Sequence, residues 1–283
     1  AGVRIGGIDR FCGILNGPND LGGLMLITVG AALVCWDGSS RRQRLLLALT
    51  IAAAAIFCAI ADSRSAFVAV GAGCALYLIW KKGLRGILIC GGGLALAAAA
   101  ALAIDPGLFA YIGRGNVGTL TGRTDIWAFA IKSIKERPLL GYGYEVSGAI
   151  FKSKYFPLWW GPWNYGPHSS LHDGYLGHAV GVGIPAAMFW MYIVMRPWFF
   201  VFRQDGDPWR LKSIFFLVAV PILVNNLSEQ ILGDFAGSAA LLFGLSWALA
   251  ERYRLVMLER AATEEKENLS RMPRAMAALT ANR

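Results

Sequence analysis

The sequence is poor in charged residues and lacks any pattern of paired cysteines, and each absence excludes a class of protein. Only 16% of the 283 residues are charged and 56% are hydrophobic, whereas soluble domains carry about 25% charged and about 45–50% apolar residues. The five cysteines are an odd number and include no CxxC pair, which argues against a disulfide framework or a cysteine metal site. An ordinary soluble domain is therefore excluded.

The apolar residues are grouped into runs long enough to cross a bilayer, because about 20 helical residues span about 30 Å of hydrocarbon. We therefore expect an all-α membrane protein with about seven transmembrane helices. The expected spans are residues 21–36, 45–61, 65–80, 84–104, 174–195, 212–227 and 237–250. The first residues show no signal-peptide pattern, and we expect a fragment that lacks its natural N-terminus.

Basic residues cluster at alternate ends of the spans, as they do in short cytoplasmic loops. The clusters follow the first, third and fifth spans and comprise Arg41, Arg42, Arg44, Lys81, Lys82, Arg85, Arg196, Arg203, Arg210 and Lys212. Residues 62–65, 105–170 and 228–236 should then face outwards. The net charge of +9 is mainly a mark of the cytoplasmic face, and not of nucleic-acid binding.

We divide the chain into four parts. These are N-terminal transmembrane helices (1–104), an outer cap loop (105–170), C-terminal transmembrane helices (171–250) and a cytoplasmic tail (251–283).

The cap is far longer than a connection requires and rich in tryptophan, so we expect one large structured loop. Within it residues 124–137 predict an amphipathic helix. Its apolar stripe consists of Ile126, Trp127, Ala130, Ile131 and Ile134. The cap tryptophans can alternatively form a belt that anchors the loop to lipid headgroups.

Two arginines lie on the outer side, against the trend of the other basic residues. Arg64 stands at the mouth of the third span, where a charge is costly without water, a counter-ion or a ligand. Arg123 precedes the amphipathic helix, whose N-terminal N–H groups would add to a site suited to phosphate. Alternatively, Arg64 extends to headgroups or pairs with Asp62, and Arg123 pairs with Asp125.

Two histidines, His168 and His172, lie four residues apart where the cap re-enters the membrane. They lack a third partner for zinc. A neutral imidazole near two outward arginines can serve as a general base. A hydrogen-bonded structural histidine is the alternative for these two residues. His178, deeper in the span, is expected to be a packing or hydrogen-bonded residue.

Further polar residues are lesser candidates for contacts with sugar hydroxyls. Capping, or pairing with a neighbouring helix, is the alternative for those that interrupt the apolar run after residue 224. The lesser candidates are Glu145, Asn225, Asn226, Glu229 and Asp234.

Short motifs occur in a fixed order along the chain. They are residues 16–20 (Asn-Gly-Pro-Asn-Asp), 63–67 (Ser-Arg-Ser-Ala-Phe), 122–127 (Gly-Arg-Thr-Asp-Ile-Trp), 138–143 (Pro-Leu-Leu-Gly-Tyr-Gly), 172–176 (His-Asp-Gly-Tyr-Leu) and 183–186 (Gly-Ile-Pro-Ala). Together they resemble the O-antigen ligase and O-antigen polymerase superfamily of bacterial inner-membrane proteins. The distance from His172 to Gly183 selects His172 as the family histidine. Asp173 departs from the family's usual Asn or Ser, and Gly177 from its frequent acidic residue. The family's N-terminal spans are absent from this sequence, as expected of a fragment.

The resemblance implies a metal-independent, cofactor-free glycosyltransferase of the GT-C type, with its active face in the periplasm. Such an enzyme takes a glycan from undecaprenyl diphosphate and transfers it to a sugar hydroxyl of lipid A core or of another glycan, in lipopolysaccharide or exopolysaccharide synthesis. By carry-over, Arg64 and Arg123 would bind the diphosphate and His172 would deprotonate the acceptor. The further substrate-binding residues that we expect are His168, Tyr175 and Asp125.

A transporter or channel for an anionic solute is the main alternative, because outward arginines and intramembrane glycine and proline can line an anion path. Against it, no acidic or basic residue lies in the middle of any expected span. A non-enzymatic assembly or sensor subunit is a third possibility.

Overall fold

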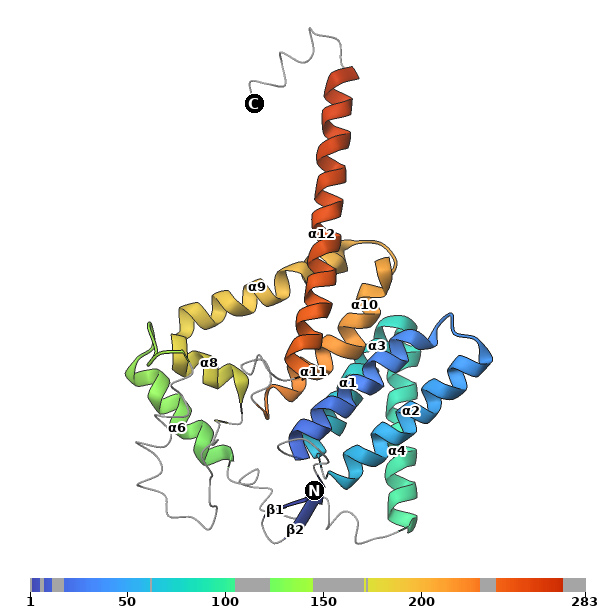
Figure 1. Cartoon of the computed structure of the whole chain (residues 1–283), viewed down its shortest axis with the longest axis vertical. Helices are drawn as coiled ribbons and strands as arrows, with labels where there is room; N and C mark the ends of the chain where they lie inside the picture. The colour runs from blue at the N-terminus through green and yellow to red at the C-terminus, as the bar shows by residue number, and fades with distance from the viewer. Residues whose placement is uncertain are drawn as a thin grey trace.

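The computed structural model describes residues 2–5, 8–11, 18–61, 63–104, 123–144, 171, 173–229 and 238–271. An N-terminal hairpin pairs β1 (Gly2–Ile5) with β2 (Ile8–Phe11) in antiparallel register. Every other described element is helical, in agreement with the all-α prediction. Figure 1 shows the first four helices on one side of the molecule and α6, α8 and α9 on the other, with α10, α11 and the lower part of α12 between them.

The first four helices begin and end close to the predicted spans. They are α1 (Pro18–Trp36), α2 (Arg41–Ile60), α3 (Arg64–Lys82) and α4 (Leu84–Ile104). Ser40 and Gln43 form a reciprocal capping box at the start of α2, which satisfies two N–H groups that helical bonds leave free. The polar clusters that end each apolar run are therefore also the helix boundaries.

The predicted span 174–195 is wrong as a single helix, because the chain turns within it. It forms α8 (Gly174–Val182) and α9 (Ile184–Arg203), separated by Gly183 at φ +81°. Glycine adopts this backbone conformation without steric cost. Pro185 lies in the first turn of α9, where its missing N–H breaks no helical hydrogen bond. Figure 1 shows α8 folded back beneath α9.

The predicted span 212–227 is helical but irregular. After a short 3-10 turn, η4 (Pro208–Arg210), it contains α10 (Leu211–Ile214), a π-helical segment η5 (Phe215–Ala219) and α11 (Val220–Asn225). Pro221 has no N–H to bond the carbonyl of Leu217 four residues earlier. That carbonyl lies against Gly30 of α1, where an added Cβ would be 2.1 Å from the oxygen. Close packing on α1 thus accompanies the irregularity.

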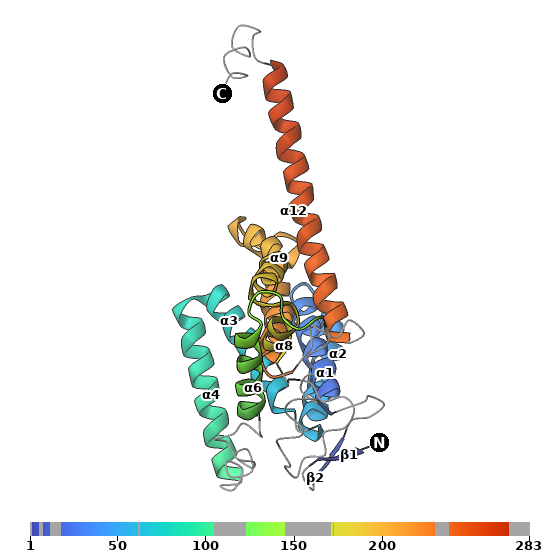
Figure 2. The same ribbon diagram turned by 90° about the vertical axis from the view of Figure 1, so that its left-hand side faces the viewer.

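The last helix, α12 (Ser238–Arg271), has 34 residues and is about 51 Å long at 1.5 Å per residue. It continues well past the predicted span 237–250 into the segment that we assigned to the tail. Figures 1 and 2 show its C-terminal half standing clear of the other helices. Near its middle, Glu251 accepts hydrogen bonds from Arg196 at 2.6 Å and from Arg254 at 2.7 Å.

Three described helical segments are long and apolar enough to cross a membrane: Arg41–Ile60, Ile184–Arg203 and Pro208–Asn225. Shorter apolar helices cover Leu21–Trp36 and Leu84–Gly93. Many large apolar side chains on α2, α4, α9 and α12 stay exposed, among them Leu45, Leu46, Leu49, Leu88, Leu96, Met188, Phe189, Leu241 and Leu245. Exposure on this scale is unfavourable in water and natural in contact with lipid, which supports a membrane protein.

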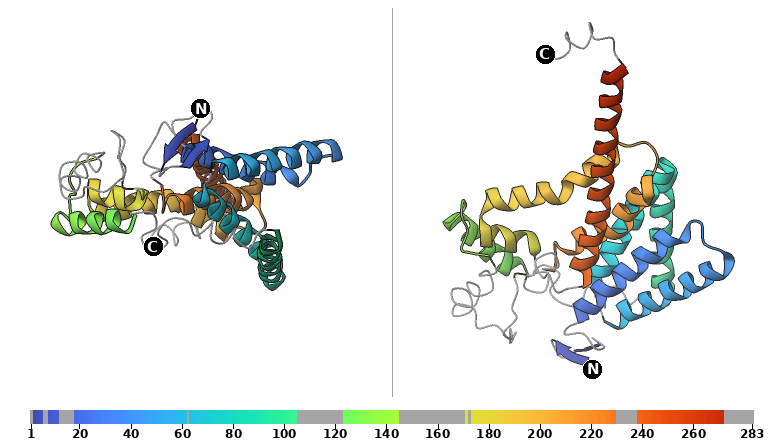
Figure 3. Two further views of the ribbon diagram at one scale, coloured as in Figure 1. Left: turned by 90° about the horizontal axis from the view of Figure 1, so that it is seen from below. Right: turned by 45° about the horizontal axis from the view of Figure 1, so that its top comes forward.

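The described helices share two hydrophobic cores. In the larger one, α1, α3, α9, α12 and the 211–222 segment meet around Leu26, Trp198 and Ile222; the view from below in Figure 3 shows these elements converging. The smaller core joins α8 to α6 (Arg123–Glu136). The candidate site lies beside this second core.

Candidate functional site

The amphipathic helix predicted at 124–137 is present as α6, and its apolar side packs on α8. Ile126 and Ala130 are buried against Leu171 and Val180. Ile131 is 46% exposed, so only part of the predicted stripe contributes to this core. The contact fixes the position of α6 relative to the start of α8.

Backbone hydrogen bonds join the segment that follows α6 to the turn between α8 and α9. Gly143 N donates to Gly181 O at 2.8 Å, and Ile184 N donates to Pro138 O at the same distance. Two of the motifs found in the sequence are thus bonded to each other directly.

The same contact explains two glycines. Gly141 has φ +64°, and an added Cβ would lie 2.4 Å from Gly181 O; Gly183 has φ +81°, and its Cβ would lie 2.3 Å from Leu139 O. An L side chain at either position would be strained and would also push two backbones apart. The two glycines therefore permit the close approach of these segments.

Asp173 caps the N-terminus of α8. Its Oδ1 accepts from the N–H groups of Tyr175 and Leu176, both at 2.9 Å. Burial raises the pKa of the Asp173 carboxyl, while these two bonds act to lower it. Asn and Ser make the same cap, so the departure at Asp173 preserves this local function.

The start of α8 is also bonded to the end of α11. Gly174 N donates to Asn226 O at 2.9 Å, and Tyr175 OH donates to Leu223 O at 2.8 Å. Asn225 and Asn226 are both buried. The Tyr175 hydroxyl, expected to contact substrate, is bonded to backbone in this structure.

An ion pair connects the turn after α11 to the first turn of α6. Arg123 Nη2, in the first turn of α6, donates to Glu229 Oε1 at 2.5 Å. Asn19 Nδ2, in the first turn of α1, donates to the same oxygen at 2.8 Å. The Arg123 and Glu229 side chains are 22% and 12% exposed, so the pair is largely shielded but reachable. Arg123 thus has Glu229 as its partner, whereas Asp125 was the alternative that we expected.

The other predicted site residues are Arg64, Asp125, His168 and His172. Arg64 is the first residue of α3 and is exposed, next to the buried Ser63, and Asp125 is exposed on α6. His168 and His172 lie outside the described residues. Within the described part of the chain, no three His, Cys, Asp or Glu side chains converge as possible metal ligands.

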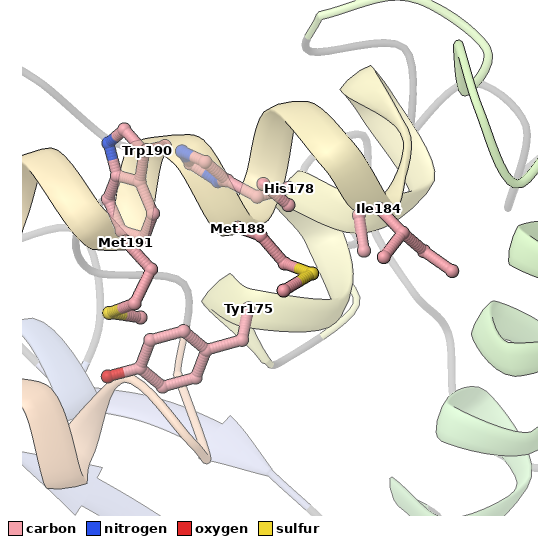
Figure 4. A pocket seen from close by; sticks show the side chains of 8 residues that line it. Tyr175, His178, Ile184, Met188, Trp190 and Met191 are labelled. Atoms are coloured by element: carbon pink, nitrogen blue, oxygen red, sulfur yellow. The ribbon is translucent and has the colours of Figure 1, made fainter.

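A pocket of about 220 Å³ lies between α8 and α9 and is mainly apolar. Figure 4 shows the Tyr175 side chain from α8 beside Met188 and Met191 from α9, and the His178 ring beside Trp190. The His178 ring lies 4.3 Å, centroid to centroid, from that of Trp190. The packing role expected for His178 is confirmed.

Sequence reasoning did not identify Asn19 as a site residue and ranked Glu229 among the lesser candidates. Asn19 belongs to the 16–20 motif, and its signal was a polar pair, Asn19 and Asp20, in the first turn of a mainly apolar helix. For Glu229, pairing with another helix was the expected alternative, and the structure gives α6 as that helix. Glu145 and Asp234 lie outside the described residues.

A known protein family matches the central part of the chain. The profile of the family described as O-antigen ligase matches residues 47–191, slightly more than half of the chain. The matched range includes Arg64, Arg123 and His172, but neither Asn19 nor Glu229. No curated protein matches the chain.

Proposed function

The chain belongs to the O-antigen ligase family, and from this premise we propose that it transfers a glycan from undecaprenyl diphosphate to a sugar hydroxyl. The family consists of membrane-embedded glycosyltransferases of the ligase or polymerase type. The acceptor would be lipid A core or another glycan, in lipopolysaccharide or exopolysaccharide synthesis. The observation that carries the proposal is that Arg123, at the start of α6, already holds an anionic group.

Arg123 would bind the diphosphate of the donor. It is partly shielded and pairs with a carboxylate at 2.5 Å, which supports a role for its guanidinium in binding an anion. A diphosphate leaving group gains negative charge in the transition state, and a preorganised guanidinium stabilises that charge without a metal. Arg64, exposed at the start of α3, would be the second such group.

His172 would be the general base. In this mechanism it removes the proton of the acceptor hydroxyl as that oxygen forms a bond to the anomeric carbon. The bond between that carbon and the diphosphate oxygen breaks, and undecaprenyl diphosphate departs with the electron pair. The residues on both sides are well anchored, since Leu171 is buried against α6 and Asp173 caps α8. Such anchoring suits a residue that must be held in place.

The remaining expected substrate contacts, His168, Tyr175 and Asp125, complete the proposed site. We propose further that the chain has about seven spans and that residues 105–170 form a periplasmic cap. The division of the chain into four parts, with boundaries at residues 104, 170 and 250, follows from this topology. The donor and the acceptor would then meet on the outer face of the inner membrane.

Glycan analysis in a strain that lacks the gene tests the function. Complementation with Arg64→Ala, Arg123→Ala or His172→Ala should give at least about 10²–10³-fold less product, the usual effect of losing one transition-state contact. Lys132→Ala removes an exposed positive charge from the same helix α6 and should behave as wild type. Near wild-type product from one of the three variants at equal membrane abundance would refute that residue's role.

The null strain also separates the branches of the family. Retention of a single repeat with loss of chain length would indicate a polymerase, whereas accumulated lipid-linked polymer would indicate a ligase. Anion flux through liposomes that contain the pure protein, without glycan transfer, would instead support a transporter or channel.

A further inference from the structure

We propose that Glu229 is an internal counter-ion that occupies Arg123 until an anionic ligand displaces it, and that Asn19 holds Glu229 in this position. The inference rests on the proposed function, since it assigns an exchange of partners to the arginine that would bind the diphosphate. Glu229 and Asn19 would be positioning residues, because they act on the donor through Arg123.

The contacts place the Glu229 carboxylate between two donors. Its Oε1 accepts from Arg123 Nη2 at 2.5 Å and from Asn19 Nδ2 at 2.8 Å. The Glu229 backbone is fixed as well, since its N–H donates to Asn225 O at 2.9 Å. The carboxylate therefore meets Arg123 in a defined position at the end of α11.

A counter-ion is needed at this position in the absence of ligand. The Arg123 side chain is only 22% exposed, and a charge that is largely withdrawn from water is costly without a partner. Glu229 supplies one negative charge at little cost, because Asn19 and the turn after α11 orient it beforehand. The arginine is thereby held in one place before any ligand arrives.

The described ion pair can nevertheless be exchanged. It uses a single guanidinium nitrogen, Nη2, whereas the strongest arginine–anion contacts are bidentate. A diphosphate carries more charge than a carboxylate and presents several oxygens that match the guanidinium fork. Once it is bound, the Glu229 carboxylate lies near a like charge, which weakens binding and favours release of the diphosphate product.

Pyrophosphate binding to the purified chain in nanodiscs, measured by isothermal titration calorimetry, tests the exchange. Glu229→Gln keeps a hydrogen-bonding side chain of the same shape but removes the competing charge. We expect it to bind inorganic pyrophosphate about 5–150-fold more tightly than wild type, the usual range for coupling between two ligands. Asn19→Ala, which frees the carboxylate from its second donor, should tighten binding by at least about fivefold.

A matched control is Glu136→Gln, which removes one negative charge from the far end of α6. We expect it to bind pyrophosphate as wild type does. Tightening equal to that of Glu229→Gln would overturn the proposal, because it would indicate a general effect of net charge.

Two results distinguish failure of the inference from failure of the function. If Arg123→Ala binds pyrophosphate as wild type does, Arg123 is not a diphosphate ligand and the proposed function fails at this residue. If Arg123→Ala no longer binds pyrophosphate while Glu229→Gln binds it no more tightly than wild type, Arg123 is a diphosphate ligand but the proposed exchange of Glu229 for the anion is wrong. Should Glu229→Gln fail to fold, Asn19→Ala decides, since it leaves the carboxylate in the chain.

Discussion

Arg123 and Glu229 lie 106 residues apart in sequence and are joined by an ion pair of 2.5 Å. The pair connects the first turn of α6 to the turn that follows α11, and Asn19 extends the connection to α1. Backbone bonds and the smaller core attach α6 to α8 independently. The helix predicted for the cap is thus bound to the helical body at both of its ends.

The proposed topology predicts the side of the membrane from which exposed positions can be reached. In a variant without native cysteines, Lys135→Cys on α6 should react with a membrane-impermeant maleimide in intact spheroplasts. Lys82→Cys, at the end of α3, should react only after permeabilisation. Both side chains are exposed in the structure, so a difference in labelling reports the side of the membrane. Labelling of both positions in intact spheroplasts would contradict the expected arrangement of spans.

The two glycines where the segment after α6 meets the turn between α8 and α9 should not tolerate side chains. Gly141→Ala and Gly183→Ala each combine a positive φ with a backbone atom within 2.4 Å of the added Cβ. We expect each to lower the free energy of unfolding by at least about 2 kcal/mol. Gly71→Ala, inside α3 with nothing within 4 Å of the new atom, should be neutral or slightly stabilising. Thermal unfolding in detergent compares the three, and equal melting temperatures would refute the packing described.

The ion pairs of Glu251 should make stability depend on pH on the acidic side. Hydrogen bonding from Arg254, with the positive charges of Arg254 and Arg196, lowers the pKa of the Glu251 carboxyl in the folded chain. A lowered pKa stabilises the fold above the unfolded value, and this contribution is lost as the pH falls through the folded value. Glu251→Gln should therefore be less stable than wild type at pH 7, by about 1 kcal/mol.

The difference in free energy of unfolding between Glu251→Gln and wild type should shrink as the pH is lowered below the ordinary glutamate pKa. Melting curves in detergent between neutral and acidic pH measure it. Glu264→Gln, an exposed change farther along α12, should show no such dependence. If the stability difference between Glu251→Gln and wild type stays constant with pH, loss of the ion pairs is not the cause of that difference.

The helices of the N-terminal half were predictable because composition determines them locally. Polar clusters such as Ser39–Arg44 interrupt apolar runs, and the structure ends α1 and begins α2 at that cluster. The break at Gly183 was less evident, since a glycine followed by Ile-Pro occurs within an unbroken apolar run. Only the contact of Gly183 with Leu139, more than forty residues away, explains why the chain turns there.

The site was predictable only in part, for a related reason. Arg123 could be selected because its charge lies on the unusual side of the expected membrane. Its partner could not be selected from the sequence, because Glu229 is 106 residues away and several other acidic residues lie nearer to Arg123. Pairing across such distances depends on how α6, α8 and α11 pack, and a single sequence does not contain that information.

The three side chains of this contact, Asn19, Arg123 and Glu229, come from the beginning, the middle and the last quarter of the chain. The segment that the family profile matches, residues 47–191, contains only Arg123. A fragment cut at those limits would retain Arg64, Arg123 and His172 yet lack both the Glu229 carboxylate and the Asn19 amide that bonds it. Proteins of this kind assigned from the matched segment alone can therefore differ in their anion site, and they are better compared at the residues outside it.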